Sequence, residues 1–312
     1  MRYFLSVAIC VIVSLVLLSI GVRYISGLWL FTSVHSLQIH LSLGCILALL
    51  FALALRRNVL PWSLLVVSLL FLAHGIWMTQ DLKQVDDDAA TVQPVLRLMS
   101  INILMTNFEN SQAIRDMILQ SGADIVNVME AAPLKGELAA LSAVYPHRIG
   151  CGEMTIHCDL MVLSKTLLAS PAIYTLSNVF EERMMLAQVS LGGQTVDVAA
   201  IHTTKPYFDA FQTFELVNAA RSLGRVEGPL VLSGDFNASS LAPNIRQFLR
   251  WTGLRTAGWE PPTWPDWAGW LGVPIDHVYV RPPLRITSLR RLPDPLGSNH
   301  YGLIAEIALG SD

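Results

Sequence analysis

Several polar side chains in the second part of the chain stand at the end of an apolar run or just before one. In residues 228–237 such a run stops at Gly234, Asp235 and Asn237. Neighbouring strands end along one edge of a sheet, so such side chains can meet in one polar pocket. Carboxylates and amides bind hard cations, and imidazoles transfer protons, so this pattern indicates metal-assisted acid–base chemistry. The five clearest members are Asn102, Glu130, Asp235, Asp276 and His300.

The composition indicates that part of the chain lies in a membrane. Of the 312 residues 53% are hydrophobic and only 14% charged, which is unusual for a soluble protein. Three runs without an acidic or basic side chain, 4–22, 37–55 and 59–78, are each long enough to span a bilayer as a helix. The first run could instead be a cleaved signal peptide, but the two later runs favour an anchor. Residues 1–80 are therefore predicted to be a membrane domain with three transmembrane helices.

Basic residues near these runs predict the orientation of the spans. Arg56 and Arg57 lie between the second and third runs and Arg2 precedes the first, whereas acidic residues follow the third. Cytoplasmic loops carry an excess of basic residues. We therefore expect the N-terminus in the cytoplasm and everything after residue 80 outside it. Arg23, in the first external loop, is an exception to this pattern.

The cysteines bear on the same placement. Cys10 and Cys45 lie in the spans, and Cys151 and Cys158 flank a short polar segment. A disulfide-closed hairpin is expected there if the domain folds in an oxidising compartment. Two unpaired thiols are the alternative, and a zinc site is less favoured because only His157 stands near the pair.

Residues 81–94 are predicted to be an acidic linker, and 95–312 a catalytic domain of the α/β class. Short strand patterns alternate with helical ones in it without a regular βαβ order, which favours an α/β sandwich. Strands are expected at 95–103, 125–129, 160–163, 187–191, 196–201, 230–232, 275–280 and 303–307. Helices are expected at 111–120, 208–223 and 244–251.

An ordered set of motifs in this domain resembles the endonuclease/exonuclease/phosphatase superfamily, which has the DNase I-like fold. The motifs are Ser100-Ile-Asn102, Val128-Met-Glu130, Ala200-Ile-His202, Ser233-Gly-Asp235-Phe-Asn237, Ile275-Asp276-His277 and Ser298-Asn299-His300. Each is weak alone, and Asp235, for example, could simply form an Asx turn; the order of the whole set carries the resemblance. The resemblance covers about residues 95–308. It implies a four-layer β-sandwich flanked by helices, with the site at one end.

The resemblance also implies a metal site. Magnesium, with manganese as an alternative, is expected on Glu130, with Asn102 beside it supplying an amide oxygen or positioning a water. Asn299 stands where the family usually has aspartate, so it would offer a metal an oxygen without a charge. Met129 replaces a usual glutamine, a change expected to affect only the support of Glu130.

The remaining motif residues correspond to the acid–base machinery of the family. His300 is the expected base or transition-state hydrogen-bond donor, and Asp276 would fix its tautomer. Asp235 with Asn237 would orient the nucleophilic water, and His202 would donate to a phosphoryl oxygen. His277, adjacent to Asp276, is expected to be structural.

The sequence favours a lipid-linked substrate over nucleic acid. From residue 90 onward, 16 basic side chains face 20 acidic ones, whereas nucleases usually present a basic face. Five tryptophans, which are common at membrane interfaces, precede Asp276, although some of them must also cover core. They are Trp251, Trp259, Trp264, Trp267 and Trp270.

We therefore expect a magnesium-dependent phosphohydrolase or phosphodiesterase anchored in the bilayer. Resemblance to membrane-bound bacterial relatives implies a multi-pass protein of the bacterial inner membrane, with an extracytoplasmic catalytic domain. A lipid-linked phosphate or pyrophosphate is the expected substrate. A metal-dependent surface nuclease is the alternative, and a catalytically silent binding module is less favoured.

Overall fold

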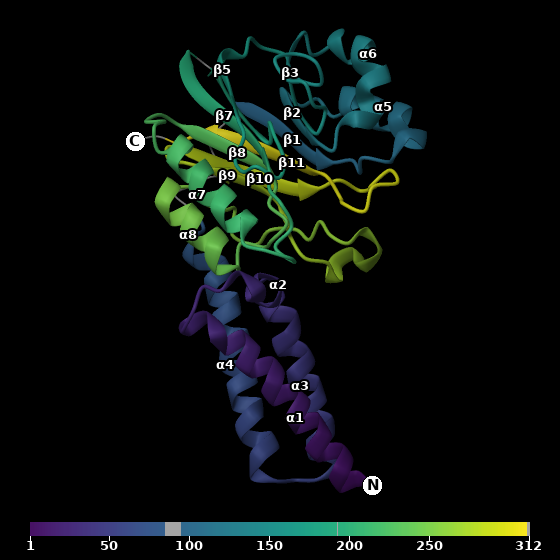
Figure 1. Ribbon diagram of the computed structural model, residues 1–312, viewed down its shortest axis with the longest axis vertical. Helices are drawn as coiled ribbons and strands as arrows, with labels where there is room; N and C mark the ends of the chain where they lie inside the picture. The colour runs from purple at the N-terminus through teal and green to yellow at the C-terminus, as the bar shows by residue number, and fades with distance from the viewer. Residues whose placement is uncertain (85–94, 192, 311–312) are drawn as a thin grey trace.

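The computed structural model describes residues 1–84, 95–191 and 193–310. A bundle of long helices stands below a larger unit of two sheets and several shorter helices (Figure 1). Most of the predicted acidic linker, residues 85–94, lies outside the described residues. The predicted boundaries between membrane domain, linker and catalytic domain therefore stay predictions.

The three predicted spans are long apolar helices. They are α1 (Arg2–Gly21), α3 (Gln38–Leu55) and α4 (Val59–Asp81), and the short α2 (Thr32–Ser36) lies before α3. All three are long and apolar enough to cross a membrane. Most of their large side chains point outward, and a narrow seam that includes Leu17 and Leu49 packs between them. Outward-facing apolar side chains suit a lipid environment, so the structure is consistent with membrane anchoring.

The larger unit contains two mixed sheets. One sheet has the strand order β10-β11-β1-β2-β4-β3 and the other β5-β6-β7-β8-β9. The strands of the first are β1 (Leu96–Asn102), β2 (Ile125–Met129), β3 (His147–Gly150), β4 (Leu160–Ser164), β10 (Leu284–Arg291) and β11 (Leu303–Leu309). Those of the second are β5 (Ala169–Tyr174), β6 (Met184–Leu191), β7 (Gln194–His202), β8 (Leu230–Asp235) and β9 (Asp276–Val280).

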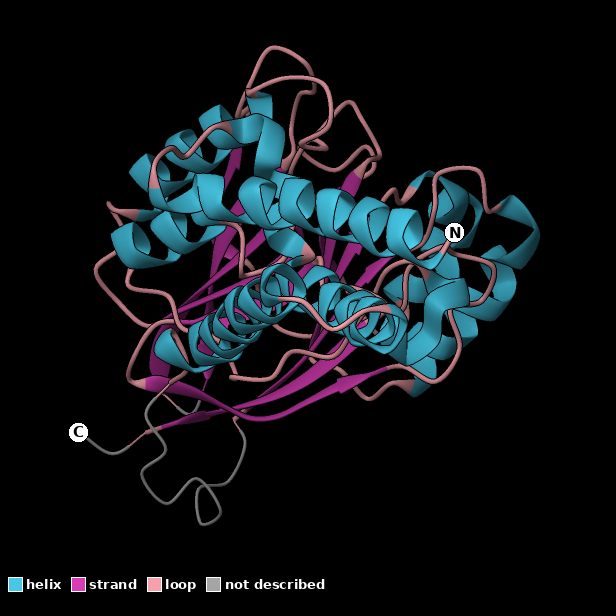
Figure 2. Cartoon of the chain, turned by 90° about the horizontal axis from the view of Figure 1, so that it is seen from below, coloured by secondary structure: helices cyan, strands magenta, loops and turns pink. Residues whose placement is uncertain are grey.

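The sheets pack face to face with helices on their outer sides, which gives four layers. One apolar core lies between the sheets. A second joins the β5–β9 sheet to α7 (Phe211–Leu223) and α8 (Pro243–Thr252). A third joins the other sheet to α5 (Ser111–Gln120) and α6 (Leu138–Ser142). Figure 2, seen from below, shows helices in front of the strands. The predicted fold class is confirmed.

Polar contacts fix the unit that contains the two sheets, here called the catalytic unit because the predicted site residues lie in it, to the adjacent end of the bundle. Arg23 donates to the carbonyl oxygen of Leu241 over 2.9 Å, and the Ser239 hydroxyl donates to that of Ser36 over 3.1 Å. Arg246 on α8 donates to the Met78 carbonyl oxygen, 2.9 Å away, and pairs with Asp81. Arg23, the exception to the expected charge pattern of the loops, thus contacts the unit that contains the two sheets.

Cys151 and Cys158 form a disulfide, as the sequence predicted. The bridge closes the loop between β3 and β4, and both cysteines are buried at the edge of the core that packs against α5. Neither is free to ligate zinc. Cys10 and Cys45 are free thiols within the bundle.

Candidate active site

Strand pairing brings three of the predicted residues to one edge of the β5–β9 sheet. His202 ends β7 and pairs in register with Asp235, the last residue of β8; Asp235 in turn pairs with Asp276, the first residue of β9. Gly234 permits this approach, because its φ of +151° is unusual for other residues and a Cβ would overlap the carbonyl oxygen of Ile201. The glycine is therefore part of the site's construction.

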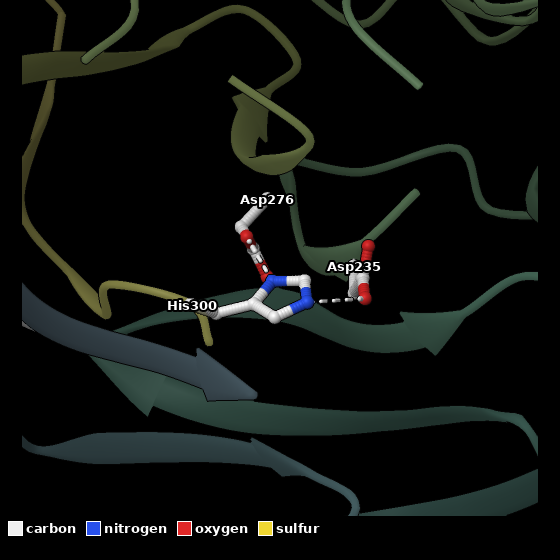
Figure 3. Close-up of side chains that lie close together, drawn as sticks. All are labelled: Asp235, Asp276 and His300. Atoms are coloured by element: carbon white, nitrogen blue, oxygen red, sulfur yellow. Dashed lines mark hydrogen bonds and ion pairs between the residues drawn. The ribbon is translucent and has the colours of Figure 1, made fainter. Parts of the chain in front are cut away.

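His300 lies between two of these carboxylates. Its Nδ1 is 2.8 Å from Asp276 Oδ2 and its Nε2 is 3.9 Å from Asp235 Oδ2 (Figure 3). Burial disfavours the charged ring, but Asp276 and Asp235 outweigh burial and raise the pKa of His300 to about 9. The Ser298 hydroxyl fixes this loop by accepting from the His300 N–H and donating to the Asn102 carbonyl oxygen.

Asp235 is almost completely buried, with 1% of its surface exposed. Burial, and then the neighbouring Asp276, raise the pKa of its carboxyl above the ordinary value. The backbone N–H of Asn237 donates to Asp235 Oδ1 over 2.7 Å, and the Asn237 side chain donates to the Thr203 carbonyl oxygen. Asn237 adopts a φ of +50°, so its backbone is held in a sparsely populated conformation.

The other sheet contributes Asn102 and Glu130. Asn102 ends β1 and Glu130 follows β2 with a φ of +56°. The Asn102 side-chain NH2 donates to Glu130 Oε1 over 3.2 Å and to Asp235 Oδ2 over 3.0 Å. The Met105 N–H donates to Glu130 Oε2 over 2.6 Å. These bonds join the two sheets into one polar cluster of seven of the eight predicted residues.

Asn299 is the predicted residue that the structure leaves outside this cluster. Its backbone carbonyl oxygen accepts from the Asp266 N–H over 3.0 Å, and its side chain makes no hydrogen bond to the cluster among the described residues. His277 is structural, as predicted: it is fully buried between Glu260, 2.7 Å from Nδ1, and the Ala238 carbonyl oxygen, 2.9 Å from Nε2.

The sequence interpretation missed two further residues. Asp159, directly before β4, lies 2.8 Å from His202 Nδ1 and 3.0 Å from Arg183 Nη2. Burial opposes its ionisation, but His202 and Arg183 outweigh burial and lower the pKa of Asp159. Asp159 stands just before an apolar run, so the rule that selected Asp276 would have found it. Arg183 carries no comparable signal.

Beside the cluster lies an open cleft of about 610 Å³. Its walls include Met105, Asp159 and Arg183, which touch or belong to the polar cluster, together with Lys135 and Phe180. The Arg183 guanidinium lies over the Phe180 ring, 3.6 Å from its centroid. The cleft borders the cluster, and its walls carry both basic groups, Lys135 and Arg183, and acidic ones, Asp159 and Glu181, so it can admit a polar substrate.

Two sets of residues could hold a cation. Atoms of Asp235, Asp276 and His300 lie within 4.8 Å of one another, but His300 Nδ1 and Asp276 Oδ2 are already bonded to each other, and Nε2 is 3.9 Å from Asp235 Oδ2. Glu130 and Asn102 fit better. The Asn102 NH2 occupies the position between the carboxylates of Glu130 and Asp235, so this position attracts positive charge. If the amide were turned by about 180°, its oxygen would face the same position and could bind a cation.

The chain belongs to the endonuclease/exonuclease/phosphatase family, whose family model matches residues 99–312. Its members are in general metal-dependent phosphoric ester hydrolases. A search of curated proteins found no match.

Solved structures share the fold. An endonuclease/exonuclease/phosphatase from Beutenbergia cavernae DSM 12333 is 18% identical, with a TM-score of 0.53 over 70% of this chain and 72% of that one. The human Nocturnin catalytic domain with bound sulfate is 16% identical, with a TM-score of 0.56 over 70% and 96%. Sphingomyelinase C from Streptomyces griseocarneus is 16% identical, with a TM-score of 0.52 over 69% and 99%.

Proposed function

We propose that this protein is a membrane-anchored, extracytoplasmic, magnesium-dependent phosphohydrolase or phosphodiesterase that acts on a lipid-linked phosphate or pyrophosphate. The observation that carries the proposal is the convergence of Glu130 and Asn102 with Asp235, Asp276 and His300 at the end of a sandwich mounted on three apolar helices. The first pair would hold the metal, and the last three would carry the proton chemistry.

Glu130 and Asn102 are the proposed metal residues. A hard cation such as Mg²⁺ needs only one or two carboxylates because it keeps several waters, and when bound it neutralises charge on the non-bridging phosphoryl oxygens. The Met105 N–H holds one oxygen of Glu130 and so fixes the direction of the carboxylate. Asn299 was expected to be a third ligand; its backbone carbonyl oxygen is bonded to the Asp266 N–H, and its side chain stays a proposed ligand.

Asp235 and His300 divide the proton chemistry. The raised pKa of Asp235 suits a base that takes a proton from the attacking water. The raised pKa of His300 keeps its ring charged at neutral pH, so it serves as a donor to the phosphoryl group rather than as the base. Asp276 holds the ring in position. His202, oriented by Asp159, supplies a second donor.

Two features support the extracytoplasmic placement. Arg56 and Arg57 lie between α3 and α4, at the end of the bundle away from the sheets (Figure 1). The disulfide between Cys151 and Cys158 is typical of an oxidising compartment. Protease treatment of intact spheroplasts tests the placement: digestion of the domain there supports it, and protection until the membrane is ruptured would refute it.

The substrate class rests on charge and anchoring. The region from residue 90 onward carries a formal charge of −4, which is unfavourable for gripping the backbone of a nucleic acid. The fold itself does not decide, since similar structures include a sphingomyelinase and a DNA-bound TDP2 from D. rerio. Anchoring confines the site to the bilayer surface, where lipid-linked phosphates are concentrated.

The test is an assay of the full-length protein in lipid nanodiscs with Mg²⁺. Substrates are a lipid phosphomonoester, a phosphodiester lipid, a polyprenyl pyrophosphate and duplex DNA, each with and without chelator. We expect turnover of at least one lipid, abolished by chelation and by His300→Gln. Cleavage of DNA alone would establish the nuclease alternative, and binding without any turnover would establish a silent module. Asp116→Asn, on the exposed face of α5, is the control that should remain active.

A further inference from the structure

A second cavity lies where the catalytic unit meets the membrane helices. Its volume is about 270 Å³, near the lower end of ligand pockets, which measure about 300–1,000 Å³. Ile39 and Leu43 on α3 and Met78 near the end of α4 line one side. The segment between α8 and β9 supplies the other side, including Trp259 and Leu271. The walls are thus mainly apolar, unlike those of the cleft beside Asp159.

The cavity is continuous with the surface that faces lipid. Leu43 lines the cavity and is also 46% exposed on the outer face of α3. The same face continues along the helix to Leu47, one turn further into the span, which is 68% exposed. Because α3 is a candidate membrane span, hydrocarbon lies against this face, and the cavity extends it upward toward the catalytic unit.

The opposite wall ends in an exposed aromatic turn, η6 (Asp266–Leu271). Trp267 and Leu271 are 84% and 79% exposed. Figure 1 shows the segment that leads into β9 below the sheets, on the side of the helical bundle. Large apolar side chains that remain uncovered at this level suit the membrane interface, where tryptophan is enriched.

The same wall is joined to the catalytic cluster. The Asp266 N–H donates to the carbonyl oxygen of Asn299, next to His300. The backbone N–H of Asp276 donates to the hydroxyl of Thr263, which follows the cavity residue Pro262. Arg291 lies over both the Trp270 and Tyr301 rings. A ligand in the cavity would therefore lie one wall away from the reacting groups.

We propose that this cavity binds a hydrocarbon chain of a membrane lipid and that the lipid is the substrate whose phosphate enters the catalytic cluster. The second half of the proposal rests on the proposed function, while the binding of a chain does not. His40 adds one polar feature to the wall: its Nδ1 is buried and has no hydrogen-bond partner among the described residues. This nitrogen could take a hydrogen bond from, or give one to, a polar group of a bound lipid.

Photo-crosslinking of the full-length protein in nanodiscs tests chain binding without requiring activity. The probe is a phosphatidylglycerol with a diazirine on one acyl chain, at trace level in unlabelled lipid, and labelled peptides are mapped by mass spectrometry. We expect label on the peptide that contains Trp259 and Leu271. Leu43→Trp, which fills the cavity, should reduce that label about tenfold, equivalent to about 1.4 kcal/mol of binding free energy. Leu47→Trp, outside the cavity, is the matched control.

Equal labelling in Leu43→Trp and Leu47→Trp, or label confined to outer helix faces, would refute the cavity as a lipid site. If Leu43→Trp does not fold, Leu271→Asp places a charge at the exposed mouth instead and should lower the label similarly. Turnover then tests whether the bound lipid is the substrate. Leu43→Trp should slow hydrolysis of a long-chain substrate but not of a soluble short-chain analogue. Absence of all lipid hydrolysis would defeat the proposed function while leaving the crosslinking result intact.

Discussion

The two sheets contribute unequal halves to the catalytic cluster. The β5–β9 sheet supplies Asp235 and Asp276, which are almost fully buried; the Asn237 N–H holds the Asp235 carboxylate, and the Thr263 hydroxyl holds the backbone of Asp276. The other sheet supplies Glu130, which is partly exposed beside an open cleft. One half is thus preorganised before any ligand arrives, whereas the other retains access to solvent. A rigid half suits proton transfer, and an accessible half suits exchange of a hydrated cation.

The comparison is tested most strongly at Asp235. Asp235→Asn preserves the shape but removes the proton acceptor, so turnover should fall by about 10³-fold or more. Magnesium binding, measured by calorimetry, should weaken less than in Glu130→Gln, because the proposed ligand Glu130 is retained and only the neighbouring charge of Asp235 is lost. A variant that loses magnesium binding and turnover together would show that the two halves are not separable.

Glu130→Gln should give the converse result. Removing the one charged ligand should raise the magnesium concentration needed for half-maximal turnover by about 100-fold, with activity recovered at high magnesium. Glu153→Gln, which makes the same change at a largely exposed carboxylate away from the cluster, is the control. Unchanged magnesium dependence in Glu130→Gln would mean that the metal binds to Asp235 and Asp276 instead of Glu130.

Asp276→Asn should change the ionisation of His300. In chelator, NMR titration of the wild-type ring is expected to have its midpoint near the value of about 9. Removing the nearest carboxylate should lower that midpoint toward about 6.5, and turnover should fall about tenfold to a hundredfold.

The sign of the linked stability follows from the raised pKa of His300. The charged ring stabilises the fold fully below its ordinary value of about 6.5, and this contribution is lost as the pH rises through about 9. In Asp276→Asn the free energy of unfolding should therefore fall less than in the wild type between pH of about 6.5 and about 9. An unshifted midpoint in the variant would mean that Asp276 does not control the ring.

Asp159→Asn should have the smallest effect of the four. The change removes the partner that orients His202 and leaves Arg183 unbalanced, so turnover should fall by about tenfold. Glu181→Gln, on the rim of the same cleft, should remain near wild type. A loss as large as that of Asp235→Asn would place His202 among the principal catalytic groups.

Much of the fold was predictable because its strands are buried and its spans are long. The apolar runs at β2, β4 and β8 are fully buried, so their pattern alone located them. β3, β5 and β10 were not predicted. They are short or carry exposed or partly exposed side chains such as His147, Ser170 and Arg290, so their pattern is weak.

The site was predictable in its members but not in its geometry. Residues at strand ends could be selected from the sequence, and Asn102 and Glu130 do meet Asp235. Sequence alone could not show that Asn299 turns its carbonyl oxygen to Asp266, because that depends on how η6 packs. The role of Arg183 could not be predicted from the sequence either, because its partner Asp159 comes from the opposite sheet.

The contacts from Arg23, Ser36 and Asp81 to the catalytic unit have a consequence for reach. A domain on a flexible linker can tilt and reach phosphates at many distances from the bilayer surface. A domain that is hydrogen-bonded to its helices at several points keeps one distance and one orientation. Weakening these contacts, for instance with Arg246→Ala, should therefore reduce the selectivity between lipids with small and with large head groups before it lowers the rate of hydrolysis. The helical bundle would thus set the distance from the bilayer at which a phosphate can reach the site.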